Sequence, residues 1–332
     1  MSGARDPRVT DPQSAGPRER APHGGHAPAG ERRPALSDRT PAAPVDPAPA
    51  PAVRAPRPHV VRLGPRSVVA LVLVSAVGVA GFGWPLLAGP AAQVNAHAQD
   101  APWLFAAVLV LLVAVVAATV SETGLGAKAV AMLGVLAATG AALRPLGAGT
   151  AGIEPMFFLM VLSGRVLGPG FGFVLGSVTM FASALLTGGV GPWMPFQMVA
   201  MGWFTMGAGL LPAPDRMRGR GELLMLAAYG FLAALAYGTI MNLSGWPFMD
   251  TLASGIAFDP GASLPHNLAR FLAYCAATSL GWDLGRALCT VVLTLVLGGA
   301  VLKALRRATR RAAFEAPVAF RGPADGDRPG TA

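Results

Sequence analysis

Residues 157–212 form three apolar blocks, and this stretch constrains the fold more than any other part of the chain. Glycine- and proline-rich hinges at 168–170 and 188–192 separate the blocks, and Arg165 is the only charged residue within them. A stretch of this polarity needs lipid around it, and its backbone groups must be hydrogen-bonded within helices. We therefore predict an all-α integral membrane protein with many spans.

The composition of the whole chain agrees with this prediction. Of 332 residues, 53% are hydrophobic and only 13% are charged, whereas soluble domains carry about 25% charged residues. The net charge of +9 comes mainly from arginines in the two tails and in one short loop. That distribution is typical of a membrane protein that follows the positive-inside rule, so we expect a lipid bilayer and no nucleic acid as partner.

Apolar segments and tails divide the chain into four parts. Residues 1–66 are rich in Pro, Ala and Arg and predict a disordered cytoplasmic tail. Residues 304–332 form a second, basic cytoplasmic tail. Between the tails we expect about eight transmembrane helices: 67–87, 102–120, 128–143, 155–167, 171–186, 193–211, 223–241 and 280–301. Residues 267–277 are either a separate interfacial or re-entrant helix or an early start of the eighth helix.

Three clusters of basic residues predict the orientation. They precede the first helix, follow the sixth at 216–220 and follow the eighth at 303–311. An eight-helix count places all three on one side, which the positive-inside rule assigns to the cytoplasm. We therefore expect a multi-pass protein of the cell membrane with both termini cytoplasmic.

Motifs of catalysis are absent from the sequence. It contains no phosphate-binding loop, no zinc-protease motif and no nucleophile elbow. The glycines at 168–172 lie between membrane helices and include Pro169, so they do not form a dinucleotide fingerprint. Cys275 and Cys289 are interpreted as small apolar residues. We expect a binder of small molecules with no enzymatic activity, no cofactor and no metal site.

A few polar and aromatic residues in the last three helices are candidates for a binding site. Asp283 and Arg286 are three residues apart and can pair on one helical face, either as a structural ion pair or as one wall of a site. An amide in lipid needs a neighbouring helix or a ligand as partner. Trp246, like Trp193, fits an interfacial aromatic belt as well as a site. The predicted contacts, in the outer half of the core, are Gln197, Asn242, Trp246, Trp282, Asp283 and Arg286.

Arg165 has two interpretations. It lies near the inner end of its helix, where an arginine can extend its side chain to the membrane surface. The alternative is a charge that faces protein or water within the bundle. We favour the first.

Small residues recur along one face of the third span. Ala127, Ala131, Gly134 and Ala138 make this face, and Ala142 continues it. Such stripes let a second helix approach closely. The stripe is either an internal packing seam or a docking surface for a separate membrane protein.

From about residue 128 to residue 311 the sequence resembles the substrate-binding S component of energy-coupling factor (ECF) vitamin transporters. Four segments carry the resemblance: AVAMLGVLAATGAAL, EPMFFLMVLSGRVLGPGFGFVLGSVTMFASALLTGG, GPWMPFQMVAMGW, and ATSLGWDLGRA followed by LRRA. The resemblance implies a six-helix core at 121–303, preceded by two additional helices at 67–120. It also implies a vitamin-like ligand near the outer face, with cobalamin or a thiamin-type pyrimidine as examples.

The same resemblance implies partners. They are a transmembrane T component and two cytoplasmic ATPases, which act together as an ABC-type importer. Family members dock through small residues on their first core helix, where Ala127, Ala131, Gly134 and Ala138 stand in this chain. The alternatives are a membrane permease that acts alone and a membrane scaffold without a ligand.

Overall fold

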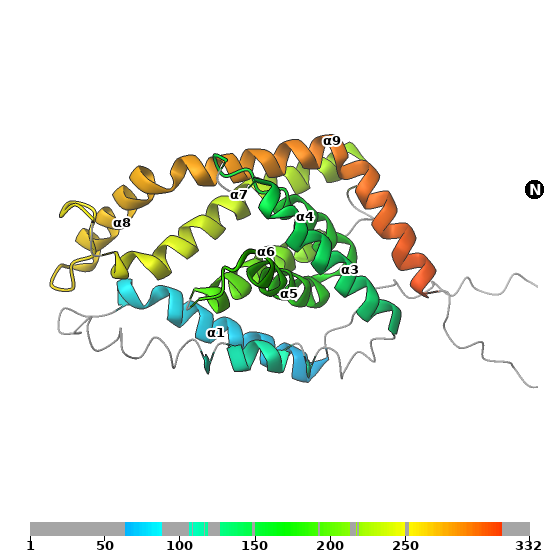
Figure 1. Cartoon of the computed structure of the whole chain (residues 1–332), viewed down its shortest axis with the longest axis horizontal. Helices are drawn as coiled ribbons and strands as arrows, with labels where there is room; N and C mark the ends of the chain where they lie inside the picture. The colour runs from blue at the N-terminus through cyan, green and yellow to red at the C-terminus, as the bar shows by residue number, and fades with distance from the viewer. Residues whose placement is uncertain are drawn as a thin grey trace, which may run out of the picture. The chain divides into compact units, whose positions relative to one another are not determined.

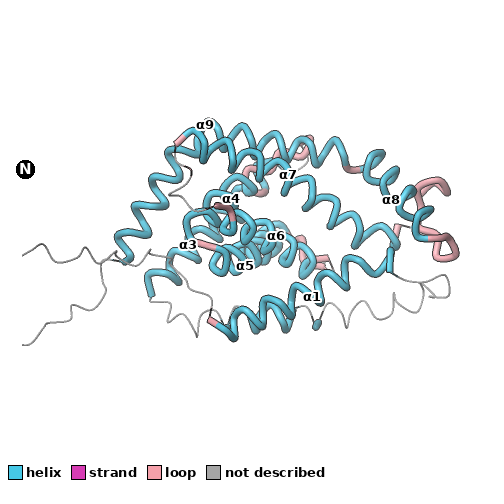
Figure 2. Tube along the Cα trace, turned by 180° about the vertical axis from the view of Figure 1, so that it is seen from behind, coloured by secondary structure: helices cyan, strands magenta, loops and turns pink. Residues whose placement is uncertain are grey.

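The computed structural model is a bundle of helices (Figures 1 and 2). It describes residues 64–87, 106–107, 109–115, 117–118, 127–147, 150–191, 193–212, 217, 219–249 and 252–313. These residues belong to one unit of the chain, 56–332. The predicted tail at 1–66 lies almost wholly outside the described residues, as do residues 314–332 and part of the second predicted span.

Every described element is helical, as the sequence predicts. The helices are α1 (Pro65–Leu87), α3 (Ala127–Leu143), α4 (Met156–Leu167), α5 (Pro169–Thr187), α6 (Met194–Leu210), α7 (Arg220–Gly245), α8 (Leu264–Thr278) and α9 (Leu280–Ala313), with short 3-10 turns at Pro145–Gly147 and Trp246–Phe248. Residues 106–107, 109–115 and 117–118 are also helical, within the second predicted span. None of the residues described here forms a strand.

Five of these helices are long and apolar enough to cross a membrane: α1, α3, α5, α7 and α9. The chain is therefore a multi-pass membrane protein by the length and composition of its helices, and the eight-span count stays a prediction. Residues 264–278 form a helix of their own, because α8 ends at Thr278 and α9 begins at Leu280.

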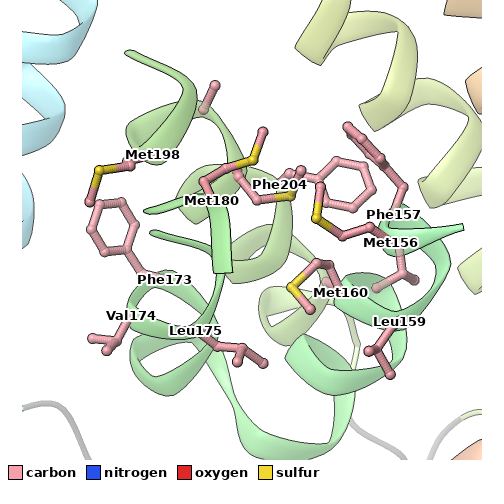
Figure 3. Close-up of a cluster of buried hydrophobic side chains, with 14 of the residues drawn as sticks. Met156, Phe157, Leu159, Met160, Phe173, Val174, Leu175, Met180, Met198 and Phe204 are labelled. Atoms are coloured by element: carbon pink, nitrogen blue, oxygen red, sulfur yellow. The ribbon is translucent and has the colours of Figure 1, made fainter. Parts of the chain in front are cut away.

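Helix α4 lies at the centre of the bundle. It is only 12 residues long, and all of them except Val166 are buried. Helices α4 and α5 both pack closely on α6 through glycines: a methyl group at Gly164 or Gly176 would collide with the α6 backbone at Thr205 or Met201. Methionines and phenylalanines fill the space between these helices (Figure 3), and methionine suits such irregular gaps because it is flexible.

Helices α7 and α9 run antiparallel in close contact. A methyl group at Gly238 would strike the Asp283 carboxylate, and one at Gly230 would lie 2.7 Å from Thr290. Nearer the start of α7, Leu223 approaches Gly298 in the same way. Glycines on both helices thus let α9 lie close to α7 along most of the length of α7.

Helices α4 to α7 alternate in direction between two ends of the bundle, and α9 runs antiparallel to α7. At one end, contacts join the end of α4 to the start of α7 and the end of α9. At the other end, contacts join the start of α9 to Glu154, two residues before α4. Leu86, in the last turn of α1, packs against the cluster around Trp246, where α7 ends. Helix α1 therefore begins towards the end of the bundle where α9 finishes (Figure 1).

Candidate functional site

Arg286 is the centre of a buried ionic network near the start of α9. Its Nε atom donates to Oε2 of Glu154 at 2.5 Å, and its Nη1 atom donates to Oδ1 of Asp283 at 2.7 Å. Arg286 and Asp283 are buried, and the side chain of Glu154 is 19% exposed. The predicted pairing of Asp283 with Arg286 is confirmed, and Glu154 is a partner that the sequence analysis missed.

The loop before α4 brings Glu154 to Arg286. Ala151 and Gly152 have φ values of 44° and 76°, a left-handed conformation that glycine tolerates best. This turn lies directly on α9, because a methyl group at Gly285 would collide with the carbonyl of Ala151. Gly285, next to Arg286, is the sequence signal that a second backbone approaches here.

Two glycines in α9 test whether the turn at Ala151 and Gly152 packs against this helix. We expect Gly285→Ala to displace the loop and to lower the free energy of unfolding by about 1–3 kcal/mol. Gly281→Ala is the control, since nothing lies within 4 Å of a methyl group there and alanine favours the helix by about 0.5–1 kcal/mol. Thermal unfolding in detergent checks both variants. Equal melting temperatures would contradict the close contact between Gly285 and the loop before α4.

Aromatic rings surround the Arg286 guanidinium. It lies 5.1 Å from the ring centre of Phe157 and 5.3 Å from that of Tyr237, within the range of cation–π attraction. The partly buried Arg144 contacts the Ser183 hydroxyl at 3.4 Å. Two cations, Arg286 and Arg144, and two carboxylates, Glu154 and Asp283, thus lie at the end of the bundle opposite Arg306.

Asn242 connects this end of α7 to the junction of α8 and α9. Its amide donates to the Ser279 hydroxyl and to the Cys275 sulfur. Ser279 is one helical turn before Asp283, so Asn242 lies next to the ionic network. Burial raises the pKa of the Cys275 thiol, which therefore accepts from Asn242 as a neutral group.

Trp246 is buried in a second apolar cluster. Its ring packs against Phe258, Phe271 and Tyr274, and its Nε1 atom donates to the carbonyl of Ile256 at 2.7 Å. These contacts fasten α8 and the preceding loop to the end of α7. They account for the burial of Trp246 without a ligand.

Gln197 and Trp282 lie apart from these contacts. Trp282 is 42% exposed although the next residue, Asp283, is buried, because neighbouring residues of a helix point about 100° apart. Gln197 is half-buried at the start of α6. Within the part of the chain that the structure describes, no hydrogen bond or ion pair joins either side chain to Arg286.

Arg165 belongs to a second buried network, and the favoured prediction that it reaches the membrane surface is wrong. Its side chain is 2% exposed, and its Nε atom donates to Oε1 of Glu222 at 2.9 Å. Arg306 donates to the same oxygen at 2.6 Å. The Nη1 atom of Arg165 donates to the carbonyls of Leu211 and Pro212, which follow α6. Arg165 therefore satisfies backbone acceptors that the end of a helix leaves open.

The three charges of this network predict an order of stabilities. Glu222→Ala leaves Arg165 buried without its carboxylate and should cost about 3–5 kcal/mol. Arg165→Ala should cost less, because Glu222 keeps Arg306. Arg306→Ala should cost least, since the Arg306 side chain is 35% exposed. Melting temperatures in detergent should fall in that order, and a larger loss for Arg306→Ala than for Glu222→Ala would contradict it.

The small-residue stripe of α3 points away from the rest of the described chain. Ala127, Ala131, Gly134 and Ala138 are all exposed, and a methyl group at Gly134 would meet nothing within 4 Å. A neighbouring face packs inward through Leu133, Ala137, Gly140 and Ala141. Within the described residues the stripe is therefore no internal seam.

The described residues hold no group of three or more His, Cys, Asp or Glu side chains that could bind a metal ion. No family model, curated protein or solved structure matches the chain.

Proposed function

We propose that the chain is the substrate-binding S component of an ECF-type importer in the cell membrane. The observation that carries the proposal is the exposed small-residue face of α3, defined by Ala127, Ala131, Gly134 and Ala138. A membrane helix that keeps such a face open can accept a second helix at close range. The T component would be that partner, and two cytoplasmic ATPases would supply the energy.

The polar end of the bundle is the proposed substrate site. Arg286, Glu154, Asp283 and Asn242 gather there beside the aromatic ring of Tyr237. A mainly apolar surround with a few convergent polar groups is typical of small-molecule sites. A vitamin-like molecule would bind here from outside the cell. Gln197, Trp246 and Trp282 stay predictions as further contacts.

The orientation and the eight-span count belong to this proposal. Helix α1 begins towards the end of the bundle where α9 finishes, which agrees with two termini on one side. The basic residues at that end support the cytoplasm as that side. Reporter fusions at the two termini should both report cytoplasm, and one external terminus would contradict the eight-span count.

A specific observation favours a second candidate, a membrane scaffold without a ligand. Arg286 is already paired with two carboxylates, so the network is stable as it stands and needs no substrate. A permease that acts alone is the third possibility, and it would need no partner on α3.

Affinity purification in mild detergent separates these candidates. The tagged chain is isolated from its own membrane, and bound proteins and small molecules are identified by mass spectrometry. An S component should retain an organic micronutrient together with a membrane protein and two ATPases. A chain that mediates uptake alone would be a permease, and one that retains no small molecule and transports nothing would be a scaffold.

A further inference from the structure

The end of α9 extends beyond its apolar part. The helix has 34 residues, about 51 Å at 1.5 Å per residue, whereas the hydrocarbon layer of a bilayer is about 30 Å thick. No charged residue occurs between Arg286 and Lys303. Lys303 therefore begins a helical segment that can extend beyond the hydrocarbon layer of the membrane.

Three cations share one face of this segment. Lys303, Arg307 and Arg310 follow one another at spacings of four and three residues, which places them together on a helix. All three are exposed, and no carboxylate among the described residues pairs with them. Leu302 and Leu305, by contrast, are buried against the bundle. We call the three cations the basic face of α9.

The network around Glu222 anchors this segment. Arg306 lies within the basic segment and donates to Glu222, which Arg165 holds from the other side. The helix is thus attached to α4 and α7 at the point where its cations begin. Side chains on an attached helix lose less freedom on binding than those on a free tail.

We infer that the basic face of α9 binds the phosphate headgroups of anionic phospholipids in the adjoining leaflet. Lys303 directly follows the apolar segment, and Arg310 is seven residues further, about 10 Å along the helix. The headgroup layer adds about 5–8 Å on each side of the hydrocarbon, so Lys303 and Arg307, about 6 Å apart along the helix, fall within it and Arg310 lies at its outer edge. Arginine donates two parallel hydrogen bonds to a phosphate, and each added cation near an anionic surface raises affinity about fivefold.

Position favours lipid over other anions. A nucleic acid or an acidic protein would bind cations that project into water, whereas these begin at the last apolar turn of a membrane helix. The inference requires that α9 spans the bilayer, and it does not depend on the transport function.

The experiment uses the full-length chain in nanodiscs. One set contains phosphatidylcholine only, and the other contains an equal part of phosphatidylglycerol. Native mass spectrometry measures retained phosphatidylglycerol, and thermal unfolding measures stability in both sets. The variant is Lys303→Gln/Arg307→Gln/Arg310→Gln. The control is Arg270→Gln on α8, an arginine that pairs with Asp259.

We expect the wild-type chain and the Arg270→Gln control to retain phosphatidylglycerol and to melt several degrees higher in its presence. The triple variant should lose at least half of both effects, yet melt like the wild type in phosphatidylcholine. High salt should weaken the preference. Equal phosphatidylglycerol retention by the triple variant would overturn the inference. So would full stabilisation by inorganic phosphate alone, or RNA binding through these residues without any lipid preference.

Discussion

Tryptophan at position 131 or 138 should abolish uptake while the purified chain still binds the small molecule that is isolated with it. Ala131 and Ala138 are exposed on α3, so a large side chain there disturbs no contact within the described residues. It would instead hold a partner helix several ångströms away. Favourable contacts between membrane helices contribute only about 1–2 kcal/mol each, so this separation should abolish docking.

Two control variants make this result specific. Leu232→Trp places the same side chain on α7 at a position that is 66% exposed, and we expect normal uptake. Ala137→Trp places it on the buried face of α3, and we expect stability and ligand binding to fall together.

Uptake in cells and ligand binding by the purified variants are the two measurements. Docking predicts that they separate for Ala131→Trp and Ala138→Trp. Parallel loss of binding and uptake in these variants would refute the docking surface and weaken the case for partner ATPases. Normal uptake would favour a permease that acts alone, with the stripe facing lipid.

The helices were largely predictable because membrane spans are read from apolar length. The predicted segments 128–143, 155–167 and 171–186 agree with α3, α4 and α5 within one to two residues. The prediction for the last helix stopped at 301, whereas α9 continues to Ala313. Hydropathy falls at Lys303, but the helix continues because Arg306 is bound to Glu222 and Leu305 is buried.

The partners of the buried charges were harder to predict. Spacing within one helix predicted that Asp283 pairs with Arg286, because residues three positions apart share a helical face. Glu154 and Arg286 are 132 positions apart, and Arg165 and Glu222 are 57 apart. Such pairs depend on how helices pack, which hydropathy does not report. Hydropathy therefore places the Arg165 side chain at the membrane surface, although the carboxylate that pairs with it belongs to Glu222 on α7.

Trp246 shows the same limit for aromatic residues. Its position at the end of a helix fits an interfacial belt, a binding site or a packing cluster equally well. Only the fold of the loop before α8 distinguishes them, since that loop supplies Phe258 and the carbonyl of Ile256.

Arg286→Met should be the most destabilising substitution in the polar end of the bundle, at about 3–5 kcal/mol. It leaves the Glu154 and Asp283 carboxylates partly or fully buried without their shared cation, and breaking a buried pair in this way carries a penalty of that size. Asp283→Asn and Glu154→Gln should each be tolerated far better, because Arg286 keeps one carboxylate in both. Arg270→Met, which breaks a partly exposed pair, should cost less than about 1 kcal/mol.

A triple variant separates folding from binding at this network. Glu154→Met/Asp283→Leu/Arg286→Met removes all three charges together, and replacing a whole buried ionic group by hydrophobic side chains of similar volume is often nearly neutral for stability. We expect the triple variant to regain a monodisperse profile in gel filtration and most of the melting temperature that Arg286→Met loses. If the triple variant stays unfolded, unpaired charges are not the cause of the stability that Arg286→Met loses.

The folded variants then decide what the network is for. Asn242→Ala and Asp283→Asn should fold and bind the co-purified molecule more weakly, because both remove polar groups from the same end of the bundle. Full affinity in both variants would place the substrate elsewhere. The ionic network would then serve only to stabilise the packing of α9 against the loop before α4. Loss of folding in Asp283→Asn would support the same structural role, since Arg286 would then need both carboxylates to remain buried. A folded triple variant that no longer binds would instead assign recognition to charges that stability does not require.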